Sequence, residues 1–119
     1  MPKTILVVDD SESIRTILKL TLQFKGYTVI EAEDGMQAYE ILKVQLVDLL
    51  ITDISMPKMT GLELLNKVRQ EMNNTTLPII ICTAEKNVSE EKFLSEGANK
   101  ILMKPVPPHE ILNEVQNLI

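Results

Sequence analysis

The chain has 119 residues, 45% of them hydrophobic and 24% charged, with a formal net charge of −5 and a sequence pI near 4.9. This length suits one domain that buries its own core without disulfides or a structural metal. The acidic balance argues against electrostatic nucleic-acid binding, which normally uses clustered lysines and arginines. We therefore expect protein partners and no nucleic acid.

The single cysteine, Cys82, lies inside an apolar run, so an internal disulfide is excluded and a buried thiol is expected. No apolar stretch approaches the roughly 18 residues that a membrane-spanning helix needs, and residues 1–3 lead into the first apolar run without the pattern of a signal peptide. These features predict a soluble protein with no membrane partner, in a reducing, cytoplasmic compartment.

Short runs rich in Ile, Val and Leu alternate with segments of helical period, which is typical of a parallel sheet covered on both faces. The first strand is predicted at residues 4–8, and the helix that follows has Ser11 as a candidate cap and Gly26 just past its end. Its apolar face is predicted to carry Ile14, Ile17, Leu18, Thr21 and Leu22. A second strand is expected at 27–32 and a second helix at 35–44.

The third strand, at 47–52, runs into Asp53 and a loop in which Pro57 delays the next helix. Gly61 is expected to supply a backbone conformation that other residues would find strained. The third helix carries Leu62, Leu64, Leu65 and Val68. The remaining elements are predicted as a strand at 78–82, a helix at 89–96 ending at Gly97, a strand at 100–103, and a last helix that starts at the prolines 107 and 108.

Polar side chains follow four of these apolar runs. Asp9 and Asp10 follow the first, Asp53 the third, Thr83 the fourth and Lys104 the fifth. The carboxyl ends of parallel strands share one edge of a sheet, so these groups are expected to converge. Three carboxylates predict a hard divalent cation, Mg²⁺ or Mn²⁺ in its place, and a carboxylate can attack phosphorus directly.

Each of these residues, taken alone, also has a purely structural interpretation. An Asp pair often ends a strand and caps a helix, and a lone lysine is usually a solvated charge. These interpretations explain each residue separately and do not predict that the residues lie together at one edge of the sheet. Their expected convergence at that edge therefore favours a functional site. The only histidine, His109, is expected at the surface beside prolines.

The whole pattern resembles the receiver domain family of two-component response regulators, of the CheY-like type. The resemblance rests on the Asp9–Asp10 pair, Asp53 with Met56–Pro57 and Gly61, Thr83–Ala84, Gly97–Ala98 and Lys104–Pro105. It implies a flavodoxin-like doubly wound (βα)5 fold, with a five-stranded parallel sheet in the order 2-1-3-4-5. It also implies one receiver domain over residues 1–119 and a cis bond between Lys104 and Pro105.

The resemblance implies a role for each site residue. Asp53 is the phosphoacceptor, while Asp10 and Asp53 bind Mg²⁺ directly and Asp9 acts mainly through water. The backbone carbonyl of Ser55 completes the protein ligands. Lys104 faces the phosphoryl oxygens, and the Thr83 hydroxyl donates to one of them.

The phosphoryl donor implied by the family is a phosphohistidine on a sensor histidine kinase or a histidine phosphotransfer protein. The effector protein that reads the phosphorylated state is not identified by the sequence. The chain is expected to be a phosphoacceptor signalling protein, not an enzyme, although it supplies the groups for its own phosphorylation and slow dephosphorylation. A stand-alone protein and a receiver within a longer chain both fit the sequence.

Two positions near the acceptor and one on the fifth strand distinguish this chain from many relatives. Ser55 and Glu85 are expected to control the approach of the hydrolytic water to Asp53. Ile101 stands where many relatives carry Tyr or Phe, so a rotating ring is not available to signal the state of the site. Val106 likewise replaces a frequent Phe.

Two other functions remain open at this point. A flavodoxin-like electron carrier would need a Ser/Thr-rich phosphate loop and stacking aromatics, whereas this chain has an acidic pair there and 3% aromatic residues. A degenerate receiver could serve as a phosphorylation-independent interaction module, but the presence of all five side chains that the family uses weighs against it.

Overall fold

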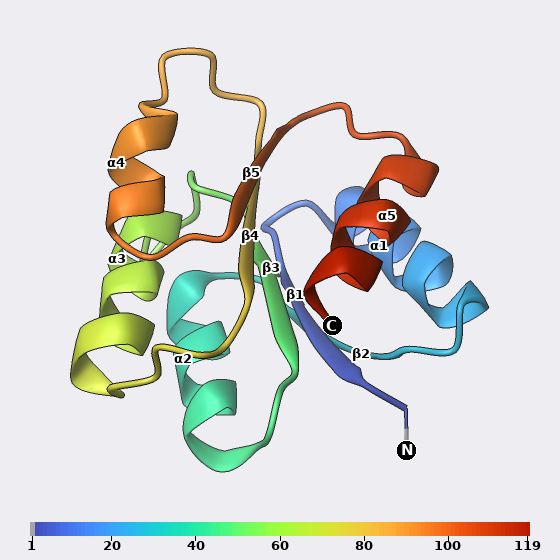
Figure 1. Cartoon of the computed structure of the whole chain (residues 1–119), viewed down its shortest axis with the longest axis horizontal. Coiled ribbons are helices and arrows are strands. Elements are labelled where there is room, and N and C mark those ends of the chain that lie inside the picture. The colour runs from blue at the N-terminus through green and yellow to red at the C-terminus, as the bar shows by residue number, and fades with distance from the viewer. Residues whose placement is uncertain (1) are drawn as a thin grey trace.

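Figure 1 shows the computed structural model, which describes residues 2–119 as a central sheet with helices on both faces. The sheet consists of β1 (Thr4–Val8), β2 (Thr28–Ala32), β3 (Leu49–Thr52), β4 (Ile79–Thr83) and β5 (Lys100–Met103). All neighbouring strands are parallel, and their order is β2-β1-β3-β4-β5. The predicted doubly wound α/β fold is therefore confirmed.

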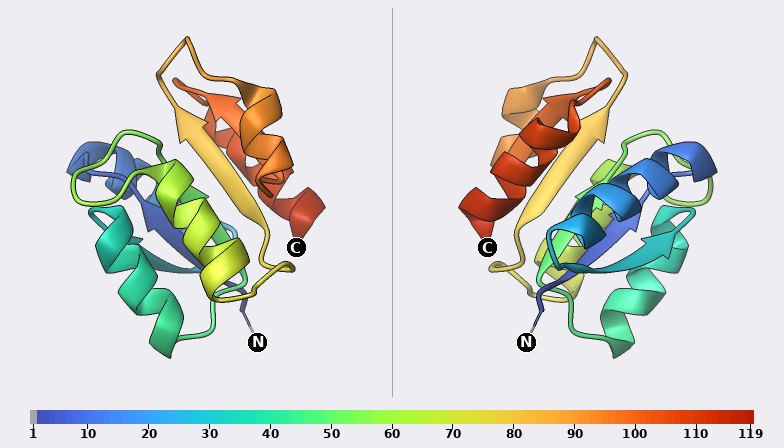
Figure 2. Two further views of the ribbon diagram at one scale, coloured as in Figure 1. Left: turned by 90° about the vertical axis from the view of Figure 1, so that its left-hand side faces the viewer. Right: turned by 90° about the vertical axis from the view of Figure 1, so that its right-hand side faces the viewer.

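The helices are α1 (Glu12–Phe24), α2 (Gly35–Val44), α3 (Gly61–Asn66), α4 (Glu90–Ser95) and α5 (Pro108–Leu118), and a π-helical segment, η1 (Lys67–Glu71), continues α3. Helices α1 and α5 cover one face of the sheet, and α2, α3 and α4 cover the other (Figures 1 and 2). This division follows from the right-handed crossovers that parallel strands require.

The core has two layers because successive side chains of a buried strand point to opposite faces. In β1, Leu6 and Val8 pack in the layer under α2 and α3, whereas Ile5 and Val7 pack in the layer under α1 and α5. All four side chains are at most 1% exposed. The sheet is thus buried on both sides, which leaves its edges and the ends of its strands for function.

Helix α1 has the predicted ends but only part of the predicted face. The Ser11 hydroxyl accepts from the Ile14 amide as a cap, and Gly26 has the left-handed φ of 90° that its place after the helix requires. Ile17, however, is 59% exposed, while Arg15 is only 8% exposed. Ile17 does lie on the same face as Ile14 and Leu18, around one cavity, but at the edge of the buried surface. The burial of Arg15 was not predicted, because periodicity alone does not identify a charged residue that has polar partners in the interior.

Several boundaries differ from the predictions by one or two residues. Strands β2, β3 and β4 start later than expected, and α4 is one residue shorter at each end. The third helix was predicted to carry Val68, but the α-helix ends at Asn66 and Val68 is buried within the π-helical segment η1. A π-helical turn adds a residue per turn and is not visible in a simple apolar period.

Gly61 is required for a different reason than the one predicted. Its φ is not left-handed; among residues 2–119, the non-glycine residues with a left-handed φ are Lys58, at 69°, and Asn73, at 52°. A Cβ atom built on Gly61 would instead lie 2.2 Å from the carbonyl oxygen of Asp53 and 2.9 Å from the Cα atom of Ile54. Glycine lets α3 begin directly against the residue that follows β3.

Other expectations are confirmed. The Lys104–Pro105 bond is cis, Cys82 is buried with a free thiol, and His109 is exposed. Among the helices that the structure describes, none has the length and apolar character needed to cross a membrane.

Candidate functional site

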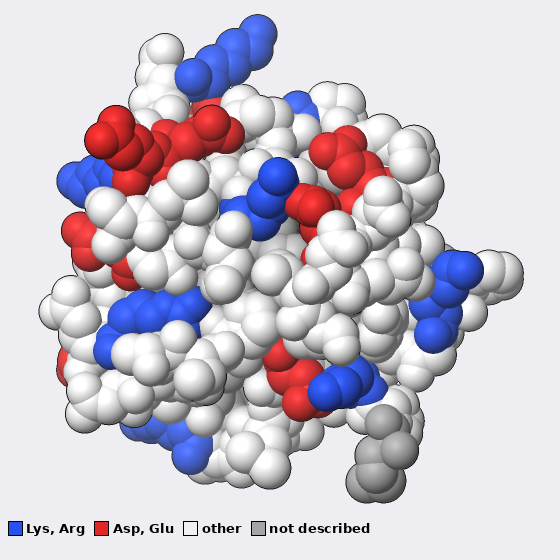
Figure 3. Space-filling model, in the orientation of Figure 1, with Lys and Arg blue, Asp and Glu red and all other residues white. Residues whose placement is uncertain are grey.

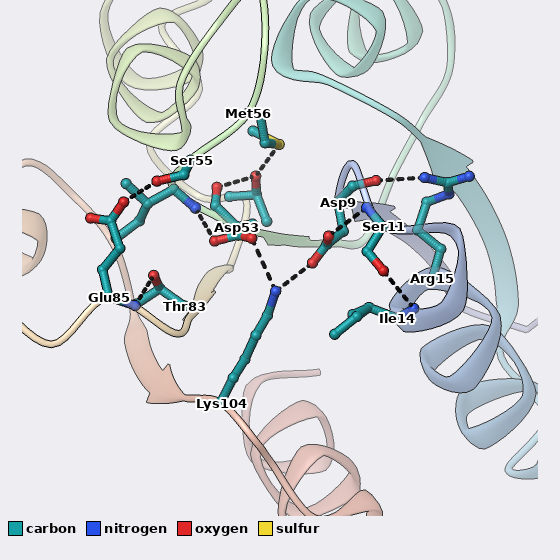
Figure 4. A network of polar contacts seen from close by, with 12 residues as sticks. Asp9, Ser11, Ile14, Arg15, Asp53, Ser55, Met56, Thr83, Glu85 and Lys104 are labelled. Carbon is teal, nitrogen blue, oxygen red and sulfur yellow. Dashed lines mark hydrogen bonds and ion pairs between the residues drawn. The ribbon is translucent and has the colours of Figure 1, made fainter.

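The polar residues that end the strands gather at the carboxyl edge of the sheet (Figure 4). Asp9 and Asp10 follow β1, Asp53 follows β3, and Lys104 follows β5. β1 and β3 are neighbours, and the Asp53 amide donates to the Val8 carbonyl at 3.0 Å. This bond extends the ladder by one residue and places Asp53 beside the acidic pair.

The carboxylates of Asp9, Asp10 and Asp53 each offer an oxygen within 4.8 Å of the others. Asp9 is only 3% exposed, Asp53 is partly buried and Asp10 is exposed, so the cluster opens to solvent on one side. Three carboxylates this close repel one another unless a cation lies among them. The donor set fits a hard divalent cation that keeps some of its water, as Mg²⁺ does.

Lys104 connects the buried Asp9 to the partly buried Asp53. Its Nζ donates to Asp9 Oδ2 at 2.6 Å and to Asp53 Oδ2 at 3.0 Å. Burial alone would lower the pKa of Lys104, but the hydrogen bonds to Asp9 and Asp53 and the attraction of both carboxylates outweigh it, so the pKa is raised. Lys104 therefore carries a full charge at neutral pH.

Backbone amides hold the other oxygen of each carboxylate. The Ser11 amide donates to Asp9 Oδ1 at 2.9 Å, and the Ile54 amide donates to Asp53 Oδ1 at 2.6 Å. Ile54 is itself fixed, because its carbonyl accepts from the Gly61 amide at 2.8 Å. Each carboxylate thus has one oxygen tied to the scaffold and one directed at Lys104.

Ser55, Thr83 and Glu85 form the opposite side of the site (Figure 4). The Ser55 hydroxyl donates to a carboxylate oxygen of Glu85, joining the loop after β3 to the loop after β4. Thr83 is fully buried, and its Oγ1 accepts from the Glu85 amide at 3.0 Å. That bond uses a lone pair, so the Thr83 hydroxyl retains its proton for another acceptor.

Sequence reasoning missed two residues that support the site. The Thr52 hydroxyl, fully buried, donates to the Asp53 carbonyl at 2.9 Å. Arg15, on α1, donates from Nη1 to the Asp9 carbonyl at 2.6 Å. A signal for Arg15 existed, because it is a charged residue one turn after the cap Ser11 and among aliphatic positions that face the sheet.

The face of the molecule in Figure 3 has acidic and basic side chains intermixed, with lysines and arginines scattered over it. Near the site, a cavity of about 390 Å³ between α1 and α5 is lined mainly by apolar side chains. Its lining residues are Ile14, Ile17, Leu18, Cys82, Ala84, Lys104, Pro105, Val106 and Ile111. The surroundings of the site are therefore apolar on the α1 side.

Comparison with known proteins gives consistent matches over the whole chain. Residues 5–116 match the family profile of the response regulator receiver domain. The chain is 41% identical over 118 residues to the chemotaxis protein CheY homolog of Campylobacter jejuni, covering 97% of this chain and 91% of that protein. The chemotaxis response regulator CheY4 of Vibrio cholerae has a similar structure, with a TM-score of 0.91, 34% identity and full coverage of both chains.

The response regulator TrrA of Thermotoga maritima, whose structure was solved in complex with Mg²⁺-BeF, gives a TM-score of 0.89. Its identity to this chain is 33%, with 98% of this chain and 99% of TrrA covered.

Proposed function

The chain belongs to the response regulator receiver domain family, and we propose that residues 1–119 form a single receiver domain that accepts a phosphoryl group on Asp53. The observation that carries this proposal is the position of Asp53 Oδ2, which lies 3.0 Å from the Lys104 ammonium within a cluster of three carboxylates. A nucleophilic oxygen between a fixed cation and a metal-type donor set suits phosphoryl transfer.

Asp10 and Asp53 would hold Mg²⁺ directly, with the Ser55 backbone carbonyl as a third protein ligand and Asp9 acting mainly through water. When bound there, the cation would neutralise negative charge on the phosphoryl oxygens and on the acceptor carboxylate. The TrrA complex with Mg²⁺-BeF supports this assignment by analogy. Mn²⁺, which prefers similar oxygen ligands, would serve as a substitute.

In the transfer step, a carboxylate oxygen of Asp53 attacks the phosphorus of a phosphohistidine. The phosphorus–nitrogen bond breaks, the imidazole of the donor leaves, and an acyl phosphate forms on Asp53. No proton has to be removed from the nucleophile because it is already a carboxylate. The Lys104 ammonium and the Thr83 hydroxyl would then donate to the phosphoryl oxygens.

The reverse of activation is hydrolysis of the acyl phosphate. A water attacks phosphorus, the bond to Asp53 breaks, and inorganic phosphate leaves. Ser55 and Glu85 would set the rate of this step, because their joined side chains lie beside the acceptor (Figure 4). The protein is thus a phosphoacceptor that supplies catalytic groups for its own modification, and we do not class it as an enzyme.

The partners we propose are proteins of the cytoplasm. A sensor histidine kinase or a histidine phosphotransfer protein would supply the phosphoryl group, and an effector protein would recognise the phosphorylated state. The acidic net charge and the scattered basic side chains of Figure 3 support protein partners over nucleic acid. Phosphorylation would act by shifting the population of two conformations of the domain.

The proposal is tested by intact-mass measurement after incubation with acetyl phosphate and Mg²⁺. The wild-type protein should gain one phosphoryl group, and Asp53→Asn should gain none. Asp48→Asn is the matched control, because Asp48 is a carboxylate whose Oδ2 accepts from the Thr4 amide at the other edge of the sheet. If the wild-type protein gains no mass and does not bind beryllofluoride with Mg²⁺, a phosphorylation-independent interaction module replaces this function.

A further inference from the structure

Arg15 is a charged residue inside α1 that the proposed chemistry does not use. It is 8% exposed, whereas arginine is rarely buried to this extent without partners. A guanidinium removed from water needs several hydrogen bonds or an opposite charge to offset the loss of hydration. The hydrogen-bond partners of Arg15 therefore indicate its role in the structure.

Within residues 2–119, two groups accept hydrogen bonds from the Arg15 guanidinium (Figure 4 shows the first). Nη1 donates to the Asp9 backbone carbonyl at 2.6 Å, and Nε donates to Glu31 Oε1 at 3.3 Å. Glu31 also pairs with Lys19 at 3.5 Å, one helical turn further along α1. Glu31 orients the guanidinium from β2, and the guanidinium in turn contacts the first residue of the acidic pair.

The Asp9 carbonyl occupies a special place in the sheet. The Asp9 amide donates to the Ala32 carbonyl at 3.2 Å, which is the last rung between β1 and β2, because β2 ends at Ala32. The Asp9 carbonyl lies past that rung, at the point where the chain turns from β1 into α1. Because β2 ends at Ala32, Arg15 and not a further residue of β2 supplies the hydrogen-bond donor for this carbonyl.

The turn that Arg15 contacts carries both acidic residues that follow β1. Asp9 Oδ1 is fixed by the Ser11 amide and Asp9 Oδ2 by Lys104. The contact with Arg15 fixes the peptide that joins Asp9 to Asp10, and so the direction in which the exposed Asp10 carboxylate leaves the turn. Residues that orient metal ligands in this way commonly change metal affinity when they are replaced.

We propose that Arg15 is a positioning residue for the divalent cation, holding the Asp9–Asp10 peptide in the orientation that lets both carboxylates face the metal. This inference rests on the proposed function, since it concerns the same acidic cluster. It assigns Arg15 no contact with the phosphoryl group.

Positioning and simple electrostatics predict opposite results for the same substitution. Arg15→Met removes a positive charge from the neighbourhood of a cation site, so electrostatics alone would tighten Mg²⁺ binding. If Arg15 positions the ligands, the same change should weaken Mg²⁺ binding, by roughly tenfold for the loss of an orienting partner. The sign of the change therefore decides between them.

Lys19→Met is the matched control. It removes the same charge from the same helix and the same partner, Glu31, but within residues 2–119 Lys19 forms neither an ion pair nor a hydrogen bond with Asp9. Mg²⁺ alone is titrated into each ¹⁵N-labelled protein without a phosphoryl donor, and the shifts of the Asp10 and Ile54 amides are followed by NMR. Urea unfolding without metal shows whether each variant is folded at the titration temperature.

The expected result is weaker Mg²⁺ binding by Arg15→Met, with Lys19→Met equal to wild type or slightly tighter. Binding by Arg15→Met that is equal to or tighter than that of Lys19→Met would overturn the proposal. If Arg15→Met does not fold, Arg15→Lys provides the test: it keeps the charge but loses the forked guanidinium, so unchanged affinity would overturn positioning. Wild-type protein without any Mg²⁺-dependent shift would overturn the metal site and this inference with it, whereas phosphorylation of Asp53 is judged separately by mass.

Discussion

The close approach of α3 to the acceptor makes Gly61→Ala the most informative single substitution. The added Cβ would lie 2.2 Å from the Asp53 carbonyl oxygen and 2.9 Å from the Ile54 Cα atom, where ordinary contact begins at 3.4 Å. Both neighbours are backbone atoms, so no side chain can rotate away. The Asp53–Ile54 peptide or the start of α3 must move by about 1 Å to relieve the overlap.

The energetic cost follows from that displacement. Overpacking of this kind costs about 1–3 kcal/mol, and the better helix propensity of alanine offsets less than about 1 kcal/mol of it. For a domain of this size, each kcal/mol lowers Tm by roughly 4 °C. The functional effect should be larger, because a displacement of about 1 Å at a reacting group can cost on the order of 10²-fold in rate.

The assay pairs urea unfolding with the initial rate of phosphorylation by acetyl phosphate and Mg²⁺. Gly26→Ala is the control, since Gly26 has a left-handed φ of 90° and open space around its Cβ position. That variant should lose about 1 kcal/mol of stability and keep its phosphorylation rate. If Gly61→Ala is phosphorylated as fast as Gly26→Ala, the close approach of α3 does not position Asp53.

Three further predictions follow from individual contacts. Burial raises the pKa of the Cys82 thiol to about 12, from 9.0. The thiol of the unfolded chain therefore ionises at a lower pH than that of the folded chain, so the free energy of unfolding falls as pH rises from about 9 towards 12. In Cys82→Ala the free energy of unfolding should fall less steeply over that pH range. An equal fall in the two proteins would show that the buried thiol is not the cause. Replacing both Ser55 and Glu85 by alanine should change the dephosphorylation rate measured by loss of the phosphorylated mass, whereas an unchanged rate removes their role. Lys104→Met should tighten Mg²⁺ binding, because it removes a cation paired with Asp9 and Asp53, while slowing phosphorylation; Lys100→Met, a charge paired elsewhere with Glu114, should do neither.

The sheet and the position of the site were predictable because both depend on local signals. Apolar runs of strand length with helical segments between them specify a parallel sheet, and polar residues directly after those runs must then share an edge. That Asp9, Asp53 and Lys104 lie at the same edge follows from the parallel topology, whereas their direct contacts also depend on the strand order. The strand order needed the resemblance, because periodicity does not say which strands are neighbours.

What the sequence did not reveal depends on contacts between distant segments. The burial of Arg15 follows from a free carbonyl at the end of β1 and a carboxylate on β2, neither of which is visible in the pattern of α1 itself. The role of Gly61 depends on how closely α3 approaches Asp53. In both cases the sequence shows the residue type, but the role of the residue depends on a group that is close in space and distant along the chain.

Occupancy of the site would reach the rest of the domain through β5. Ile101 is 8% exposed and packs in the layer that contains Phe93 and Ala98, with Ile81 as its partner in the sheet. It has no ring to rotate, but β5 is bonded directly to the site, because the Lys104 amide donates to the Thr83 carbonyl at 2.8 Å. A movement of Thr83 towards a phosphoryl group would therefore pull on the backbone of β5, and Ile101 would follow as part of the strand. Coupling in this chain would then run through the backbone of the β4–β5 ladder and not through rotation of a side chain at position 101.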